Sequence, residues 1–211
     1  MIAIDQPTPY DNHNHDQLRD TANQCRACGL CQDRHHVVFC SGPVPAPLMI
    51  IGEGPGQQED EQGLPFVGRA GQLLTSILSS VGLDRERTDI TNTVKCRPPE
   101  NRTPTPAEMT ACQPFLIRQI QLVQPQIIIL LGTAAVRDFL GTTDPISKQR
   151  GLWVTTPVSY MTHELYIMPM FHPSYLLRNA SKEKGSPKWL TWQDMKEVKI
   201  ALDFYATMTL L

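Results

Sequence analysis

The sequence lacks an excess of charge of one sign, a long apolar run and internal repeats. Its 19 basic and 21 acidic residues give a net charge of -2 at pH 7, so any contact with nucleic acid requires a local basic patch. No window of the sequence approaches the length of a membrane span. The N-terminal segment has neither the basic start nor the apolar stretch of a signal peptide. These absences predict a cytosolic protein that makes no membrane contact.

The length and composition are those of one globular domain. The 211 residues are 41% hydrophobic, which is enough to bury a full core. The first residues are mostly polar and include Pro7 and Pro9. We therefore predict a flexible N-terminal tail over residues 1–20 and a single domain over residues 21–211.

Patterns typical of strands and of helices alternate along the chain. Short β-rich or apolar runs predict strands, and longer stretches with apolar residues every three or four positions predict helices. The predicted strands span residues 37–39, 47–51, 88–92, 126–131 and 166–170, and the predicted helices span residues 69–82, 106–123, 132–140 and 189–208. This alternation predicts an α/β domain with a mainly parallel central sheet.

Three unusual loops follow predicted strands. They read GEGPGQQED after PLMII, NTVKCRPPENR after TDI and FHPSYLLR after YIMPM. Ligands of open α/β sheets bind outside the carboxyl ends of the strands. We therefore expect these loops to converge on one crevice and to form the functional site.

Four cysteines form two pairs with metal-ligand spacing. Cys25 and Cys28 form a C-x2-C chelate, and Cys96 and Cys112 form a C-x15-C pair. In a reducing compartment, cysteines serve as thiols, metal ligands or catalytic groups more often than as disulfides. Four thiolates bind either an iron–sulfur cluster or a tetrahedral zinc ion. Buried free thiols are the plainer alternative.

Two further cysteines leave the ligand set open. Cys31 extends the first pair to C-x2-C-x2-C, which is typical of the start of a bacterial ferredoxin site. Cys40 could complete a wholly N-terminal site. Spacing alone does not choose between these ligand sets, nor between zinc and iron–sulfur.

Three segments together resemble a known family. They are GEGPGQQEDEQGLPFVGRAG, NTVKCRPPENRTPTPAEMTACQPFL and FHPSYLLR, and their order and spacing are similar to those of the family 4 uracil-DNA glycosylases. The resemblance runs from about Cys25 to about Val198. It implies a three-layer α/β/α sandwich around a central, mainly parallel four-stranded sheet, and a [4Fe-4S] cluster with a structural role.

The resemblance also implies a ligand set for this cluster. The positions that match the family's ligands are Cys25, Cys28, Cys96 and Cys112. The remaining two, Cys31 and Cys40, fall at positions that the family does not use, so we expect them to remain thiols.

An enzyme of this family breaks the bond between uracil N1 and deoxyribose. The reaction needs a pocket for a flipped base, donors aimed at the anionic base, and negative charge near the sugar. Water then adds to the sugar, so no covalent enzyme intermediate is required. In better-known uracil-DNA glycosylases the first loop carries an aspartate that activates water. By resemblance, the corresponding position here is Gly54.

Glycines and acids of the first loop are therefore candidate site residues. Gly54 and Gly56 would let the backbone approach the nucleotide closely. We expect Glu59 to act on the pocket or the water, and Glu53 to position the loop or to stabilise positive charge. The plainer interpretation is that these acids are solvated, and we favour it for Glu61.

Three side chains are expected to hold the base. Phe66 would stack on uracil. Asn92 would match uracil O4 and N3–H with an amide donor and acceptor, and His172 would donate to O2 as a neutral imidazole. Each has a structural alternative, since phenylalanine suits a core, asparagine a turn and a lone histidine a packing role. The resemblance favours the functional role in each case.

The FHPSYLLR segment supplies candidate DNA contacts. Tyr175 and Leu176 would hold the base out of the stack as an apolar wedge, with core packing as the alternative for the leucine, and Arg178 would bind phosphate. Asn101 would order the loop beside Glu53. The cations that could complete a basic rim are Lys95, Arg97, Arg102, Lys182 and Lys184.

The sequence therefore predicts a monomeric uracil-DNA glycosylase of base-excision repair that acts on uracil-containing DNA. Two alternatives remain open, namely a glycosylase for another deaminated base and a non-catalytic, metal-containing DNA-binding module. In the second alternative, Asn92, His172 and Glu59 would be dispensable.

Overall fold

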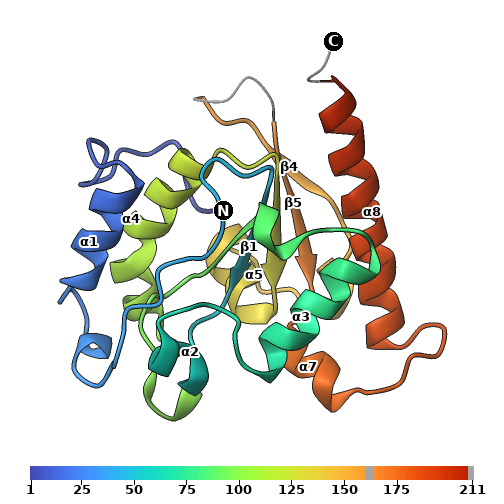
Figure 1. Cartoon of the computed structure of the whole chain (residues 1–211), viewed down its shortest axis with the longest axis horizontal. Coiled ribbons are helices and arrows are strands. Elements are labelled where there is room, and N and C mark those ends of the chain that lie inside the picture. The colour runs from blue at the N-terminus through green and yellow to red at the C-terminus, as the bar shows by residue number, and fades with distance from the viewer. Residues whose placement is uncertain (160–163, 209–211) are drawn as a thin grey trace.

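A five-stranded sheet forms the centre of the computed structural model, which describes residues 1–159 and 164–208 (Figure 1). The strand order is β2-β1-β3-β5-β4. Four strands run parallel, and β4 pairs antiparallel with β5 at one edge. The strands are β1 (Leu48–Gly52), β2 (Thr88–Asn92), β3 (Ile127–Leu131), β4 (Val154–Thr156) and β5 (Leu165–Met170).

The predicted parallel sheet of four strands is confirmed, with two differences at its edges. The edge strand β4 was missed because it has only three residues and none of them is buried. The strand predicted for residues 37–39 is absent from the described part of the chain. Gly42 has φ of +133°, and three prolines follow by residue 47. Because proline removes backbone donors, no ladder continues there.

Helices cover both faces of the sheet, which gives the three layers predicted (Figure 1). The α-helices are α1 (His15–Asn23), α2 (Gln57–Gln62), α3 (Arg69–Ser80), α4 (Pro106–Val123), α5 (Thr133–Leu140), α6 (Ile146–Gln149), α7 (Pro173–Arg178) and α8 (Pro187–Met208). Short 3-10 turns span Gly29–Cys31, Arg85–Arg87 and Pro99–Asn101. Within the described residues, no helix combines the length and apolarity that crossing a bilayer requires.

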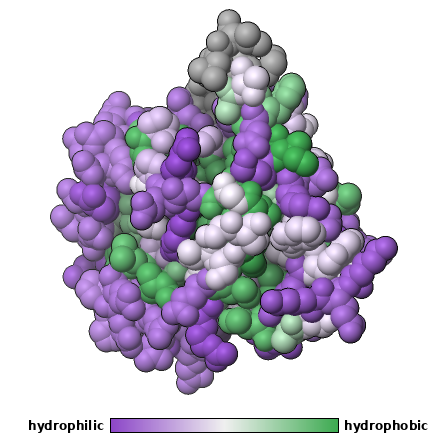
Figure 2. Space-filling model, turned by 45° about the vertical axis from the view of Figure 1, so that its right-hand side comes forward, coloured by the Kyte–Doolittle hydropathy of each residue, from purple (hydrophilic) through white to green (hydrophobic). Residues whose placement is uncertain are grey.

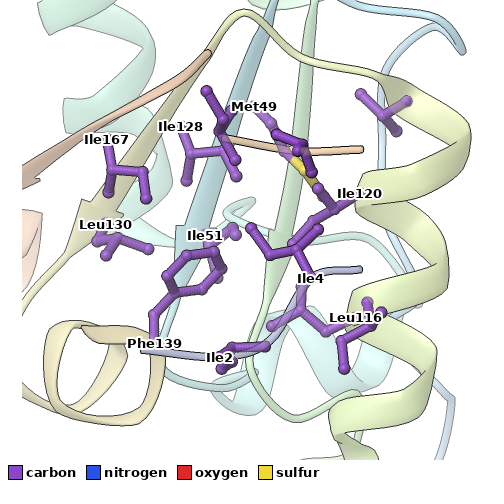
Figure 3. Close-up of a cluster of buried hydrophobic side chains, with 14 of the residues drawn as sticks. Ile2, Ile4, Met49, Ile51, Leu116, Ile120, Ile128, Leu130, Phe139 and Ile167 are labelled. Atoms are coloured by element: carbon purple, nitrogen blue, oxygen red, sulfur yellow. The ribbon is translucent and has the colours of Figure 1, made fainter. Parts of the chain in front are cut away.

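The strands are apolar on both faces because both faces are covered. Met49 and Ile51 of β1 pack with α4 and α5 (Figure 3), whereas Leu48 and Ile50 pack with α3 and α8. Successive side chains of a strand point to opposite faces. The central strands therefore read as continuous apolar runs rather than as alternating ones.

The N-terminal segment packs on this core. Ile2 and Ile4 are only 7% and 4% exposed and belong to the cluster shown in Figure 3. The Ile2 amide donates to the Phe139 carbonyl, and the Gln121 side chain donates to the Ile4 carbonyl. This packing differs from the flexible tail predicted for residues 1–20. Two isoleucines in a polar stretch give no periodic signal, so the sequence could not show their tertiary contacts.

Helix α4 begins as its sequence predicts. Thr105 is the N-cap, its hydroxyl accepts from the Glu108 amide, and the Glu108 carboxylate accepts from the Thr105 amide. Pro106 occupies the first helical position, where its missing N–H leaves no bond unmade. The helix therefore starts at a defined point directly after the proline-rich loop that carries Cys96.

Candidate active site

One pocket of about 620 Å³ lies where the carboxyl ends of the parallel strands meet the three loops. This confirms the predicted convergence of those loops on one crevice. The predicted site residues on its wall are Glu53, Gly54, Gly56, Glu59, Phe66, Asn92, Asn101, His172, Tyr175 and Arg178.

Asn92 is the last residue of β2 and is 1% exposed. Its Oδ1 atom has no hydrogen-bond partner among the described residues. A buried amide oxygen without a hydrogen-bond partner lowers the stability of the folded protein by on the order of 1–3 kcal/mol, unless a ligand donates a hydrogen bond to it. Because Asn92 lines the pocket, a donor on a bound molecule would supply the missing bond.

His172 presents one defined ring nitrogen for donation. Its Nδ1 accepts from the Ser174 amide at 3.1 Å and lies 2.8 Å from the Ser174 hydroxyl. In the neutral ring, a nitrogen that accepts carries no proton. The proton therefore sits on Nε2, which can donate to a pocket ligand.

The imidazole of His172 is held neutral. Burial lowers its pKa to about 4, the positive charge of Arg178 adds to this effect, and Glu59 opposes it. Burial is thus the main cause of the neutrality that the sequence led us to expect.

We expect an NMR titration of His172 to give a pKa near 4, with its signals assigned by comparison with a His172→Asn variant. Because this pKa lies below the unfolded value of about 6.5, the neutral ring contributes stability that is complete above about pH 6.5. That contribution is lost as the pH falls toward 4. A midpoint near 6.5 would show that the ring is not buried in this way.

Phe66 lies in a strained turn that Glu59 holds in place. Its φ is +53°, which is unusual for a bulky residue. The amides of Val67 and Gly68 donate to Glu59 Oε1 at 3.0 and 2.8 Å. The Phe66 ring is 5.9 Å from the His172 ring. Glu59 thus positions the Phe66 ring. The Oε1 atom of Glu59 does so by accepting hydrogen bonds from two backbone amides.

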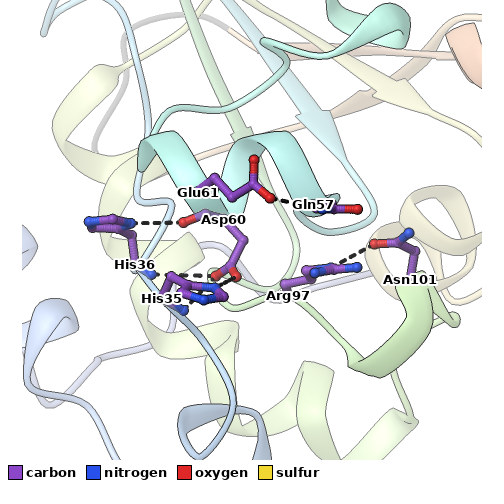
Figure 4. Close-up of polar contacts among 7 residues, drawn as sticks. All are labelled: His35, His36, Gln57, Asp60, Glu61, Arg97 and Asn101. Atoms are coloured by element: carbon purple, nitrogen blue, oxygen red, sulfur yellow. Dashed lines mark hydrogen bonds and ion pairs between the residues drawn. The ribbon is translucent and has the colours of Figure 1, made fainter.

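Asp60 joins helix α2 to the segment that follows Cys31 (Figure 4). It is 1% exposed, and its carboxylate accepts from the His35 amide at 3.0 Å and contacts His35 Nδ1 at 2.7 Å. The ring of His36 donates to the Asp60 carbonyl at 2.8 Å. A buried carboxylate with several donors fixes the backbone around it. The neighbouring Glu59 is therefore held against the Phe66 turn.

The other two loop acids differ from this pair. Glu53 lines the pocket, and its carbonyl accepts from the Thr93 hydroxyl at 2.6 Å. Glu61 is exposed and accepts from Gln57, as Figure 4 shows, which agrees with the solvated role expected for it. Gly56 leaves room for Glu59, because a Cβ there would lie 2.8 Å from Glu59 Oε2.

Five cysteines line a second, smaller cavity between α1, the loop after β2 and helix α4. They are Cys25, Cys28, Cys31, Cys96 and Cys112. Arg34 Nη1 donates to Cys96 Sγ at 3.2 Å. Cys40 lies outside this cavity, with its Sγ 3.3 Å from His15 Nε2. Within the described part of the chain, no three His, Cys, Asp or Glu side chains are close enough to hold one metal ion.

Comparisons with known proteins agree with this geometry. The model of the uracil DNA glycosylase superfamily matches residues 39–196. A type-4 uracil-DNA glycosylase of Thermotoga maritima is 46% identical over 167 residues, which are 79% of this chain and 84% of the relative. This chain belongs to the type-4 branch of the uracil-DNA glycosylase superfamily.

Two further type-4 uracil-DNA glycosylases are also similar to this chain over most of their length. The type-4 uracil-DNA glycosylase of Sulfurisphaera tokodaii is 37% identical over 192 residues, 87% of this chain and 83% of the relative. That of Saccharolobus solfataricus is 38% identical over 194 residues, 90% of this chain and 87% of the relative.

Two expectations for this member of the glycosylase superfamily need correction. Leu176 is fully buried, so it cannot act as a wedge in DNA without leaving the core. Lys95 is 2% exposed and donates to Thr91 Oγ1 and the Asn92 carbonyl, so it is no part of a basic rim. Asn101 accepts from Arg97 Nε at 2.8 Å within its own loop and lines the pocket together with Glu53, so its expected role in ordering that loop stays a prediction.

Gly52, at the end of β1 beside the pocket, was not predicted as a functional position from the sequence. A Cβ on Gly52 would lie 2.6 Å from Phe66 Cζ and would overlap Asn92 Oδ1. Gly52 therefore leaves room for both the Phe66 ring and the Asn92 side chain at the end of β1. A glycine that ends an apolar strand could have indicated such a close approach.

Proposed function

We propose that the protein flips uracil out of DNA as a monomeric uracil-DNA glycosylase and hydrolyses its N-glycosidic bond, leaving an abasic site. The observation that carries this proposal is the Oδ1 of Asn92, which no described residue satisfies, in a pocket that also contains the Phe66 ring and His172. Uracil offers a flat face and an N3–H donor, together with the O2 and O4 acceptors, which this set can match.

Selection of uracil over cytosine follows from Asn92. Its Oδ1 accepts from N3–H, and its amide nitrogen donates to O4. Cytosine has a bare N3 and an exocyclic amino group, so both bonds would be lost. A site built to hydrogen-bond one base rejects the other because its buried polar groups are then left unpaired.

Cleavage depends on His172 and on the acids of the first loop. As the N1–C1′ bond breaks, negative charge grows on uracil O2 and positive charge grows on the sugar. The Nε2–H of His172 donates to O2, and a neutral donor suits this role because it needs no proton transfer. Glu53 places negative charge near the sugar, and Glu59 holds the Phe66 turn. Gly54 leaves space for the attacking water.

DNA contacts come from helix α7 and the loop after β2. Tyr175 is 38% exposed, and Arg178 is exposed on the same helix. Both line the pocket mouth together with Asn101. Tyr175 supports the flipped state by contact with the neighbouring bases, and Arg178 binds a phosphate.

We further propose that a [4Fe-4S] cluster occupies the cysteine cavity. The ligands are Cys25, Cys28, Cys96 and Cys112, while Cys31 lines the cavity without binding iron. In such a cluster each thiolate binds a different iron, so the sulfurs need not converge on one point. Arg34 beside Cys96 adds a donor to a ligand sulfur, which favours the thiolate. The cluster's role is structural, and the chemistry stays in the pocket.

The test uses purified protein and labelled oligonucleotides that carry one uracil, hypoxanthine, xanthine or mismatched thymine, in single-stranded and duplex form. Alkali then breaks the strand at any abasic site. We expect breakage that requires uracil. Breakage only at another base would assign a different lesion. Binding of uracil DNA without any breakage would contradict catalysis and support a DNA-binding module.

A further inference from the structure

A third hollow borders helix α7, which also supplies residues to the uracil pocket. It has a volume of about 350 Å³, and it is lined by α3, α7 and the start of α8. Its floor is apolar and includes Ile77, Leu176 and Trp189, while Trp192, Lys182 and Lys188 complete its wall. We call it the Trp192 groove. Figure 2 brings the side of α8 forward and shows hydrophobic and near-neutral side chains gathered there between strongly hydrophilic ones.

The groove pairs an aromatic surface with positive charge. Trp192 remains 40% exposed although it lies next to a packed core. Lys196 Nζ is 4.1 Å from the centroid of its ring. None of the described residues that line the groove carries a carboxylate. Exposed rings flanked by lysines are how proteins bind single-stranded nucleic acid, because bases stack on the rings and phosphates approach the cations.

Two other features favour nucleic acid as the ligand of the Trp192 groove. Asp194, the acid nearest to Trp192 in the sequence, is 3% exposed and paired with Arg150, so its charge is not presented to a ligand. Helix α7 forms a wall of both hollows, because Leu176 backs the groove while Tyr175 and Arg178 line the uracil pocket. The groove thus shares helix α7 with the proposed DNA-binding face.

We propose that the Trp192 groove binds a nucleotide of the same DNA strand beyond the flipped uridine, with its base on Trp192 and its phosphates near Lys182 and Lys188. This inference rests on the proposed function. A helix with side chains is about 10 Å across, so the bound nucleotide lies a few steps along the strand from the uracil. The groove makes cleavage depend on substrate length.

The test compares two single-stranded substrates, one with a single nucleotide on each side of the uracil and one with six. Trp192→Ala is expected to lower kcat/KM about tenfold on the long substrate, the effect of losing one stacked base, and to leave the short one unchanged. Phe204→Ala is the matched control, since Phe204 is 60% exposed on the same helix and lies outside the groove. Substrates extended on one side only then assign the strand direction.

A second measurement is independent of catalysis. Binding of a uracil-free oligonucleotide is followed by anisotropy at several salt concentrations. The double variant Lys182→Gln/Lys188→Gln is expected to reduce the slope of log affinity against log salt by about 1.4, which corresponds to two phosphate contacts on a single strand. Lys199→Gln, which removes a lysine paired with Asp203 outside the groove, should leave the slope unchanged.

The outcomes separate the two proposals. Wild-type protein that leaves uracil DNA intact refutes the glycosylase, whereas the uracil-free binding measurement still tests the groove. Unchanged binding and unchanged long-substrate cleavage in Trp192→Ala would overturn the groove proposal and leave this surface to a protein partner. Equal losses on short and long substrates would also overturn it, because they would mean damage to the uracil pocket.

Discussion

Replacement of His172 by alanine is expected to lower kcat for uracil excision about 10²–10³-fold, the usual effect of removing one donor to a developing anion. The loss should appear in kcat more than in KM, because the bond to O2 strengthens only as charge builds there. Single-turnover cleavage of a uracil-containing oligonucleotide measures it directly.

The matched control for this prediction addresses a second role of the ring. His172 also caps helix α7 through Nδ1, so the alanine variant could lose activity by fraying the helix. Asparagine is a good N-cap residue but does not extend to the position of Nε2. We expect His172→Asn to keep wild-type stability in urea and still to lose excision. Retained excision in this variant would assign His172 a capping role alone.

Replacement of Cys96 by serine is expected to remove the iron and to destabilise the fold. Loss of a structural metal is one of the few changes that lower the free energy of unfolding by more than about 4 kcal/mol. For a chain of this size, that corresponds to a fall in Tm of roughly 8–16 °C. Iron analysis, visible absorbance and thermal unfolding measure the two effects together.

Cys31→Ser is the matched control, because Cys31 lines the same cavity but is not a proposed ligand. It should retain iron, colour and Tm. Loss of iron from Cys31→Ser with retention in Cys96→Ser would replace the ligand set with one that includes the third cysteine of the N-terminal run. Colourless protein in which both variants match the wild type would remove the cluster from the proposal.

The sequence predicted the elements whose signal is local. The apolar runs of β1 and β3 are fully buried strands, and the start of α4 follows from Thr105, Pro106 and Glu108. It also predicted that three loops would meet, because loops after parallel strands leave the sheet at the same edge. These inferences need only the pattern and the topology.

What the sequence could not show depends on tertiary packing. Lys95 and Arg97 are two residues apart in one polar loop, yet Lys95 is buried against Thr91, whereas Arg97 bonds to Asn101. In the same way, Tyr175 is exposed and Leu176 is buried, although both suit a DNA wedge. The helices and strands that pack over a segment decide which of two adjacent side chains is buried. The local sequence pattern does not contain this information.

The spacing of the cysteines has a consequence for chain entropy. The proposed ligands lie between residues 25 and 112, and β1, α2, α3 and β2 all lie within that interval. A cofactor bound to both pairs would close the segment that supplies Glu59, Phe66 and Asn92 into a loop. Closing loops of this length removes on the order of 4 kcal/mol of disorder from an unfolded chain. A cofactor that takes no part in the chemistry would thereby lower the population of unfolded states of the segment that carries Glu59, Phe66 and Asn92.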